Sequence, residues 1–188
     1  MDEAGHYPGL FVTVGTDEAA LEREFERAVR ETADLAVRVA FSVLRRKEDA
    51  EEVAQEGFTR AYPRFRDLRD PEHFRAWIVR VVWRAAIDRW RAERRRQARE
   101  QFAAETTAVS VEELAAEAQR SARLWEAIDD LPDKLRIVIV LSAMQGHDVQ
   151  EVARLLAIPE GTVKSRLFLA RKGLAQRLKC LANDSAKR

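Results

Sequence analysis

Apolar residues recur at steps of three and four along most of the chain, which is the spacing expected of amphipathic helices. In the first half this pattern predicts one helix over residues 21–44 and a second over residues 48–62, which Pro63 ends. A third helix is expected to begin near Pro71, because proline is favoured at the first helical position, and to run into a series of arginines. No segment alternates apolar and polar residues at a convincing strand period, so we expect an all-α fold.

The second half of the chain is predicted to hold four shorter helices. Pro132 suits a first helical position and Gly146 suits a helix C-terminal cap, so these two residues bound one of them. The four predicted helices cover residues 122–129, 132–145, 149–156 and 160–181.

The stretch between the two groups of helices has the composition of a linker, although residues 111–119 could be helical where they approach the second group. Residues 101–119 contain no lysine or arginine. If flexible, about 19 residues have an r.m.s. span of roughly 24 Å, enough to tether two modules that dock separately. We therefore expect two small helical domains joined by a linker. The predicted division is an N-terminal extension (1–20) containing an irregular tail or one short strand over Leu10 to Val14, a first domain (21–99), the linker (100–119), a second domain (120–182) and a tail (183–188).

The predicted third helix has two apolar stripes with a narrow polar strip between them. One stripe runs from Phe74 to Ala85 and the other from Val79 to Trp90. We interpret Trp83 and Trp90, in the second stripe, as core residues between packed helices, with stacking on nucleic-acid bases as the alternative. The polar strip consists of Arg80, Arg84, Asp88 and Arg91.

The composition of the 188-residue chain excludes several classes of protein. With 46% hydrophobic residues it can build one globular domain or two small ones. The single cysteine, Cys180, excludes an intramolecular disulfide framework and a zinc site of several thiolates, and it favours a reducing cytosol. The acidic start of the chain and the short length of its longest aliphatic run, Ile137 to Leu141, argue against a signal peptide and a membrane span. We therefore expect a cytoplasmic protein.

The charges nearly cancel overall but are sorted along the chain. The 33 lysines and arginines and the 32 aspartates and glutamates leave a net charge of +1. Six arginines fall within residues 89–99, and residues 164–179 hold six further cations and no acid, with an acidically biased stretch between the two clusters. One such cluster could be a solvated helix face, but two of them favour a nucleic-acid partner.

Residues 148–174 have the layout of a helix-turn-helix. Apolar residues give each of its two helices an inner face, and residues 157–159 supply a tight turn between them. The outer face of the second helix mixes side chains that bind phosphate with side chains that read bases, which suits entry into a major groove. A helical hairpin that merely packs has no need of such a cationic face. The outer-face residues are Thr162, Lys164, Ser165, Arg166, Phe168 and Arg171.

Two separated segments resemble bacterial extracytoplasmic-function sigma factors, the promoter-specificity subunits of RNA polymerase. The first is DAEEVAQEGFTRAYPRFRDLRDPEHFRAWIVRVVWRAAIDRWRAERRR and the second is LPDKLRIVIVLSAMQGHDVQEVARLLAIPEGTVKSRLFLARKGLAQRL. Together they cover about half of the chain, in the order of the family and with a similar linker. The string IPEGTVKSRLFLARK is highly specific when it follows the first segment.

The resemblance implies a binding role for each surface. In the family, the first domain docks on a coiled-coil element of the largest subunit of core RNA polymerase, and the matching helix offers Asp49, Glu52, Gln55 and Glu56. The family captures unpaired bases of the −10 element with the following loop and third helix. The matching residues are Arg66, Asp67, Arg69 and His73 in the loop, Arg80, Arg84, Asp88 and Arg91 on the helix, and Arg94 and Arg95 in the arginine run.

The resemblance also implies that the second domain reads the −35 promoter element through the six outer-face residues of the helix-turn-helix. An anti-sigma factor is an expected partner beside core polymerase and promoter DNA, and no cofactor or metal is implied. Capturing an extruded base costs a few kcal/mol of stacking and pairing, which a pocket and a cationic groove must offset.

The chain departs from the family pattern at two informative positions. It has Arg84 where many members have asparagine, so its −10 preference is expected to differ from the common one. It has Ala157 in the helix-turn-helix turn, where glycine is frequent, and this predicts that the residue does not adopt a positive φ angle.

The sequence leaves three other functions open. A sigma-like adaptor would bind and sequester an anti-sigma factor without touching promoters, and a helix-turn-helix repressor would bind an operator tightly without polymerase. An enzyme is the least favoured alternative, because His6, His73 and His147 are scattered and no nucleophile–base pairing, metal spacing or phosphate loop is present in the sequence.

Overall fold

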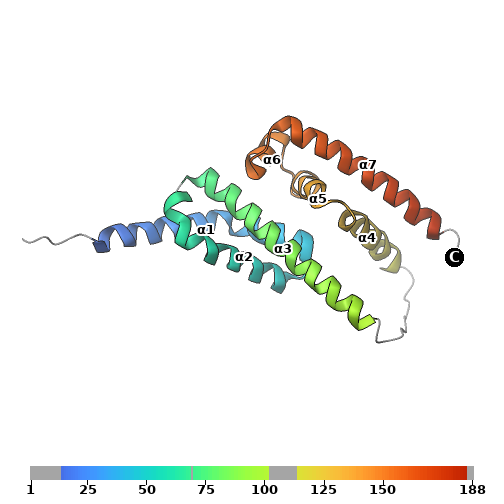
Figure 1. The fold of residues 1–188 in the computed structure, drawn as a ribbon, viewed down its shortest axis with the longest axis horizontal. Coiled ribbons are helices and arrows are strands. Elements are labelled where there is room, and N and C mark those ends of the chain that lie inside the picture. The colour runs from blue at the N-terminus through green and yellow to red at the C-terminus, as the bar shows by residue number, and fades with distance from the viewer. Residues whose placement is uncertain (1–13, 69, 102–113, 186–188) are drawn as a thin grey trace, which may run out of the picture.

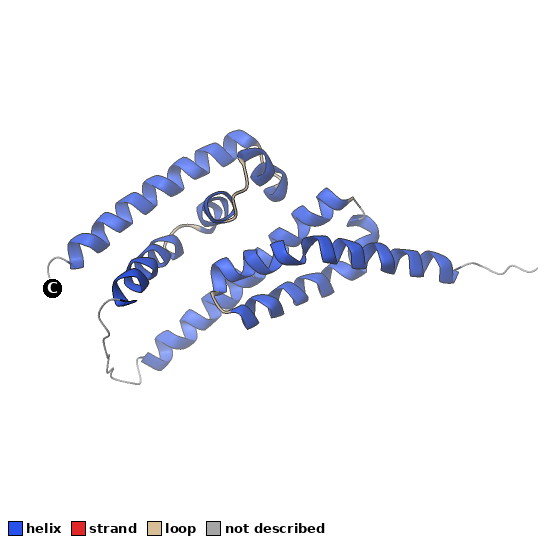
Figure 2. Cartoon of the chain, turned by 180° about the vertical axis from the view of Figure 1, so that it is seen from behind, coloured by secondary structure: helices blue, strands red, loops and turns tan. Residues whose placement is uncertain are grey.

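The structure is a computed structural model, and it describes residues 14–68, 70–101 and 114–185. The described residues form helices and no strand, which confirms the all-α prediction (Figure 2). In chain order, the elements are α1 (Val14–Leu44), α2 (Lys47–Ala61), the 3₁₀ helix η1 (Tyr62–Leu68), α3 (Pro71–Gln101), α4 (Leu114–Asp129), α5 (Asp133–Ile139), the π-helical turn η2 (Val140–Met144), α6 (Val149–Leu156) and α7 (Glu160–Ser185).

Helices α1, α2 and α3 pack on one another with η1, and we call these four elements the first bundle (Figure 1). Its centre is formed by aliphatic side chains such as Val39 and Ile78, which are fully buried. At Gly57 a Cβ atom would lie 2.7 Å from Cγ2 of Val82, so α2 approaches α3 closely because glycine has no side chain there. Phe65 anchors η1 by edge-to-face contacts with Phe25 and Phe74, at ring-centroid distances of 5.1 and 5.4 Å.

Helices α4 to α7 and η2 form a second group, which we call the second bundle (Figure 1). Helix α7 packs on α4, α5 and α6, and the apolar inner faces that the sequence predicted for the helix-turn-helix are buried at Val152, Val163 and Leu167. Asp148 caps α6, because its side chain accepts a hydrogen bond of 2.8 Å from the backbone N–H of Glu151.

The turn of the helix-turn-helix corrects one prediction. Ala157 has φ +53° and ψ +50°, the left-handed conformation, although an alanine in place of glycine predicted otherwise. The conformation is held by the helix C-cap: the backbone N–H of Ala157 donates to the carbonyl of Arg154 at 3.1 Å, and that of Ile158 donates to the carbonyl of Ala153 at 3.0 Å. These hydrogen bonds satisfy carbonyls at the end of α6 and offset the steric cost of a Cβ atom.

The remaining helix predictions agree with the structure apart from their ends. Helix α1 begins at Val14, so it takes in part of the predicted N-terminal extension, and the rest of that extension lies outside the described residues. The loop expected between the second and third helices contains the 3₁₀ helix η1. The helix predicted over residues 132–145 divides into α5 and η2, and α4 begins at Leu114, inside the predicted linker, whose residues 102–113 are not described.

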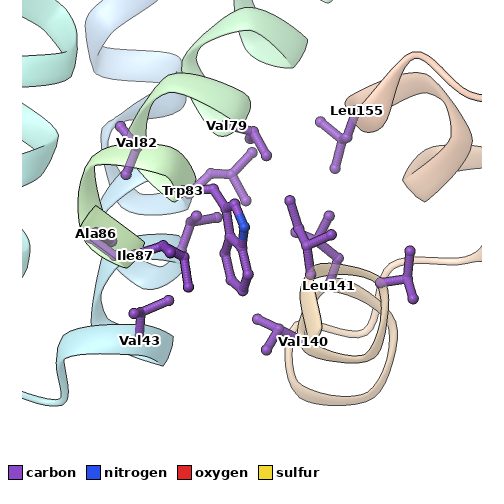
Figure 3. Close-up of a cluster of buried hydrophobic side chains, with 14 of the residues drawn as sticks. Val43, Val79, Val82, Trp83, Ala86, Ile87, Val140, Leu141 and Leu155 are labelled. Atoms are coloured by element: carbon purple, nitrogen blue, oxygen red, sulfur yellow. The ribbon is translucent and has the colours of Figure 1, made fainter. Parts of the chain in front are cut away.

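The two bundles pack directly against each other, and we call this the closed arrangement. Helix α3 lies against α6 (Figure 1), and α1 also contacts η2. Figure 3 shows the indole of Trp83 between α3 and the second bundle, with Val140, Leu141 and Leu155 on the other side. Trp83 is only 7% exposed, so its interpretation as a core residue is confirmed.

We predict that Ala157→Gly raises the free energy of unfolding by up to about 1 kcal/mol. Glycine removes a left-handed strain of about 1–2 kcal/mol and loses part of that gain to the greater entropy of the unfolded chain. Gly146→Ala is the matched control: Gly146 has φ +76° with no atom within 4 Å of the added Cβ, so the change acts through the backbone and should be destabilising. Chemical denaturation of the full chain measures both changes, and a destabilising Ala157→Gly would contradict the cap argument.

Candidate nucleic-acid interface

The predicted outer face of the helix-turn-helix lies on the surface of α7. Lys164, Ser165 and Arg171 are exposed, and Phe168 has 68% of its surface exposed. Thr162 and Arg166 are half-buried. Because the opposite side of α7 is buried against α5 and α6, the helix can present only this cationic side to a groove.

Two of these side chains make contacts within α7 itself. Lys164 Nζ lies 3.9 Å from Glu160 Oε2, and the Ser165 hydroxyl donates to the Gly161 carbonyl at 2.8 Å. Within the described part of the chain, Arg166 and Arg171 make no ion pair or side-chain hydrogen bond. The arginines are therefore available to a phosphate or a base edge.

The polar strip of α3 is brought to one side of the helix, but the second bundle engages two of its members. Arg84 and Asp88 are exposed. Arg80 is half-buried and donates to the Leu155 carbonyl at 3.2 Å. Burial lowers the pKa of Arg80, since removal from water disfavours the charged guanidinium. Arg91 donates to Asp133 Oδ2 at 2.7 Å.

The residues predicted to lie in the loop are found at and just before the N-terminal end of α3. Arg66 and Asp67 are exposed on η1, His73 is exposed in the first turn of α3, and Arg69 lies outside the described residues. Asp70 caps α3, because Asp70 Oδ1 accepts a hydrogen bond of 2.9 Å from the backbone N–H of His73.

The arginine run continues α3 beyond the bundle. Arg94 and Arg95 are exposed. The guanidinium of Arg94 lies 5.1 Å from the ring centroid of Trp90, and that of Arg136 from the second bundle lies 4.7 Å from it. Trp90 is therefore partly buried and covered by two cations, which supports packing over base stacking in the closed arrangement.

Three cavities adjoin the polar strip. One, of about 590 Å³, joins Arg84 and Asp88 to Arg60, Arg64 and Trp77, three residues that the sequence interpretation missed. A second, of about 450 Å³, brings Asp67, His73 and Arg80 together with Arg154 and Ala157 of the second bundle. The third, also about 450 Å³, lies at the junction of the bundles and joins Arg80, Arg84, Asp88 and Arg91 to Arg166; we call it the junction cavity.

The missed residues had a weak signal in the sequence. Arg60 and Arg64 lie on either side of Pro63, close to the predicted loop. Because the predicted helix ends at this proline, helical periodicity does not tell which way the two arginines point relative to α3. Trp77 lies in the first apolar stripe, where a purely structural role is the usual outcome.

The predicted acidic face of α2 is partly neutralised within the chain. Asp49 and Glu52 both bind Arg89 of α3, at 2.8 and 2.6 Å, and the hydrogen bond with Glu52 together with both negative charges raises the pKa of Arg89 despite its partial burial. Glu56 lies 3.3 Å from Arg60, whereas Gln55 is exposed. Asp49 thus links α2 to α3 by an ion pair. The exposed part of the acidic face consists of Glu52, Gln55 and Glu56.

Two polar contacts hold the two bundles together, one from the first turns of α3 and one from the residue that follows α1. Arg75 binds Glu151 at 2.6 Å, and Arg45 binds Asp129 at 2.7 Å while its guanidinium lies 4.3 Å from the ring centroid of Trp125. These pairs are partly shielded from solvent, so salt screens them less than exposed pairs.

Glu151 carries the most informative of these charges. Burial alone would raise the pKa of its carboxyl group, but the hydrogen bond with His147 at 2.9 Å and the charge of Arg75 outweigh burial, and the pKa is lowered from 4.5. A lowered carboxyl pKa contributes stability at neutral pH, and this contribution is lost as the pH falls below 4.5 through the folded-state value.

The described residues give no sign of metal chemistry or of a membrane helix. Among them, no group of three or more histidine, cysteine, aspartate or glutamate residues is placed to hold a metal ion. None of the described helices is both long and apolar enough to cross a bilayer.

Two family models match the chain. The model for Sigma-70 region 2 matches residues 28–96, and the model for Sigma-70, region 4 matches residues 121–174. The first match covers most of the first bundle, and the second covers the helix-turn-helix and the helices on which it packs.

Similar proteins share most of the length of this chain. It is 30% identical over 169 residues to the ECF RNA polymerase sigma factor SigM of Mycobacterium tuberculosis, which covers 90% of this chain and 82% of that protein. It is 28% identical over 159 residues to the ECF RNA polymerase sigma factor SigW of Bacillus subtilis, which covers 79% of this chain and 85% of that protein.

Solved structures have a similar fold. CnrH, solved in complex with the cytosolic domain of CnrY, matches with a TM-score of 0.58 and 25% identity over 85% of this chain and 90% of that one. The sigma factor RpoE, solved in complex with the anti-sigma factor NepR from Bartonella quintana, matches with a TM-score of 0.54 over 84% of this chain and 98% of that one; at 19% identity this is a likeness of fold alone.

We predict that Glu151→Lys opens the closed arrangement. The new lysine would face Arg75 across the junction, so an attraction becomes a repulsion, at a cost of about 2 kcal/mol or more. Small-angle X-ray scattering should report a larger radius of gyration for this variant. Glu22→Lys, the same charge change on the exposed surface of α1, should leave the radius of gyration unchanged. Equal radii for the two variants would contradict the packing described above.

Proposed function

The chain belongs to the extracytoplasmic-function group of RNA polymerase sigma factors, and from this premise we propose how its surfaces perform that role. It binds core RNA polymerase, directs the enzyme to promoters with −10 and −35 elements and promotes their melting. The pairing of a region 2 match with a region 4 match, in that order, carries this conclusion. We infer further that the chain acts by binding alone, without catalysis of its own, and that it works in the cytoplasm, where its polymerase lies.

We propose that α7 reads the −35 element. Lys164, Ser165, Phe168 and Arg171 are exposed on the side of the helix that points away from the bundle, and arginine is the side chain best suited to the paired acceptors of guanine. Thr162 and Arg166 complete the surface at its half-buried edge. Arg166 and Arg171 support this assignment, because within the described part of the chain they have no carboxylate partner and are available to phosphates and base edges.

We propose that the −10 element binds along the polar strip of α3 and the adjoining loop. Exposed Arg66 and Asp67 lie at one end, and Arg94 and Arg95 extend the cationic surface at the other. The cavity of about 590 Å³ beside Arg84 and Trp77 has both cations and an apolar wall, which suits an unpaired base. Arg69, His73, Arg80, Asp88 and Arg91 are proposed to share this surface.

We propose that α2 docks on core polymerase. Glu52, Gln55 and Glu56 are exposed, and a partner with a basic surface would complement them. Asp49 is assigned an indirect part, because its ion pair with Arg89 fixes the angle at which α2 meets α3.

The closed arrangement implies that the bundles separate when polymerase and promoter bind. Arg80 and Arg91 of the −10 surface are engaged by the second bundle, and Arg166 of the −35 surface faces the junction cavity. Both surfaces become fully available only after separation. We therefore propose that core polymerase supplies the binding energy for opening, and that seating both domains raises their apparent affinity for one promoter by about 10²- to 10⁴-fold.

An anti-sigma factor is a further proposed partner. Two similar folds were solved as complexes, CnrH with the cytosolic domain of CnrY and RpoE with the anti-sigma factor NepR. The alternative of an adaptor that only sequesters such a partner is not favoured, because both cationic surfaces are retained here.

We predict that Arg166→Ala lowers discrimination at the −35 element by about 1–3 kcal/mol if the side chain contacts a base. Arg95→Ala is the comparison, and it should weaken all promoters alike because a phosphate contact carries no sequence information. Run-off transcription with purified core polymerase on matched and mutated −35 elements measures both. A uniform loss from Arg166→Ala would reassign this residue to the phosphate backbone, and no transcript at any promoter from the unmodified chain would favour the adaptor.

We predict that Glu56→Arg lowers the affinity for core polymerase about tenfold, a change of about 1.4 kcal/mol, because it reverses one charge of the docking face. Transcription should fall in parallel at every promoter. Glu31→Arg makes the same change on an exposed part of α1 outside the proposed docking face, and its affinity should stay within twofold of the unmodified chain. Surface plasmon resonance with immobilised core polymerase distinguishes the two, and equal losses would move docking away from α2.

A further inference from the structure

The junction cavity has walls from both bundles. Helix α3 supplies Arg80 and Arg84, α5 supplies Lys134, and α7 supplies Arg166. Its apolar lining includes Ile137 of the second bundle. At about 450 Å³ it lies within the range of cavities that hold small molecules, and it exists only while the bundles are closed.

The charges that line this cavity are not balanced. Five cations face two carboxylates, and one of these carboxylates, Asp133, already binds Arg91 at 2.7 Å. Among the residues that the structure describes, Arg84, Lys134 and Arg166 have no ion pair and no side-chain hydrogen bond. Three unpaired cations from three different helices therefore line one cavity.

This imbalance opposes closure. Arg84 belongs to the first bundle, whereas Lys134 and Arg166 belong to the second, so the like charges repel each other across the junction. Arg80 adds a partly desolvated guanidinium, and within the described part of the chain it donates to a neutral carbonyl, that of Leu155, at 3.2 Å. A multivalent anion in the cavity would convert this repulsion into attraction from both sides.

We propose that the junction cavity binds a small phosphorylated metabolite with at least two phosphate charges, and that the bound anion holds the two bundles closed. The consequence for transcription rests on the proposed function. Arg84 and Arg166 belong to the −10 and −35 surfaces, so the anion would occupy part of both surfaces at once. It would thereby keep the free factor from promoter DNA until core polymerase opens it.

Inorganic pyrophosphate is the probe for the first experiment, with the full chain and with sodium chloride at matched ionic strength as the reference. Isothermal titration calorimetry should give one site per chain. Saturating pyrophosphate should raise the melting temperature by about 5–10 °C, the shift expected for a ligand at about 100 times its dissociation constant. It should also lower the radius of gyration of Glu151→Lys toward that of the unmodified chain.

Lys134→Gln is the decisive variant, because Lys134 is exposed and lines the cavity but belongs to neither proposed DNA surface. It should weaken pyrophosphate binding at least about tenfold, as expected for loss of one charge-assisted hydrogen bond. Lys179→Gln, the same change on an exposed residue of α7 that does not line the cavity, should stay within twofold. Equal losses in the two variants, or binding of several anions per chain, would mean that pyrophosphate is attracted by the overall positive surface and not by this cavity. Either result would overturn the proposal.

A second experiment distinguishes two possible sources of the bound phosphate, a free metabolite and the backbone of DNA. Fluorescence anisotropy with promoter DNA and holoenzyme should give the same affinity for Lys134→Gln and the unmodified chain. A parallel loss of pyrophosphate and DNA affinity would make the cavity part of the DNA path and overturn the proposal. Run-off transcription identifies failure of the proposed function separately, because pyrophosphate binding to the free chain does not depend on promoter activity.

Discussion

Helix α3 is buried on two sides, and the arrangement of the whole molecule depends on this burial. Its first apolar stripe packs on α1 and α2, while its second stripe, through Trp83, packs on η2 and α6 of the other bundle (Figure 3). Burying a large aromatic side chain stabilises a contact by about 1.5–3 kcal/mol, so this one stripe makes a major contribution to the closed arrangement. The polar strip between the stripes is thereby placed at the edge of the junction.

If the strip binds the −10 element as proposed, its position links promoter recognition to domain closure. A cationic helix surface that binds DNA must be exposed, yet Arg80 and Arg91 donate to Leu155 and Asp133 of the second bundle. The exposed Arg91–Asp133 ion pair contributes only about 0–1 kcal/mol, so it can be exchanged readily. Contacts of this strength suit a surface that must change partners when polymerase and promoter bind.

Much of the fold could be predicted from the sequence, because helical periodicity, prolines and a family resemblance are local or linear signals. The two stripes of α3 were predicted, but not that the partner of the second one, around Trp83, comes from the far half of the chain. The left-handed conformation of Ala157 was missed because cap hydrogen bonds, rather than residue type, decide it. Lys134 gave no signal as a site residue, since its cationic neighbours Arg84 and Arg166 are brought to it only by tertiary packing. The roles of individual site residues remain predictions.

The central claim is that one sigma factor alternates between a closed free form and an open form on polymerase. Fluorescence energy transfer tests it most directly, in a Cys180→Ser background with dyes on cysteines introduced by Glu72→Cys on α3 and Arg154→Cys on α6, two exposed positions whose native side chains lie 3.9 Å apart across the junction. The free chain should give high transfer efficiency, and the complex with core polymerase and promoter DNA should give low efficiency. Equal efficiencies in the two states would contradict the account.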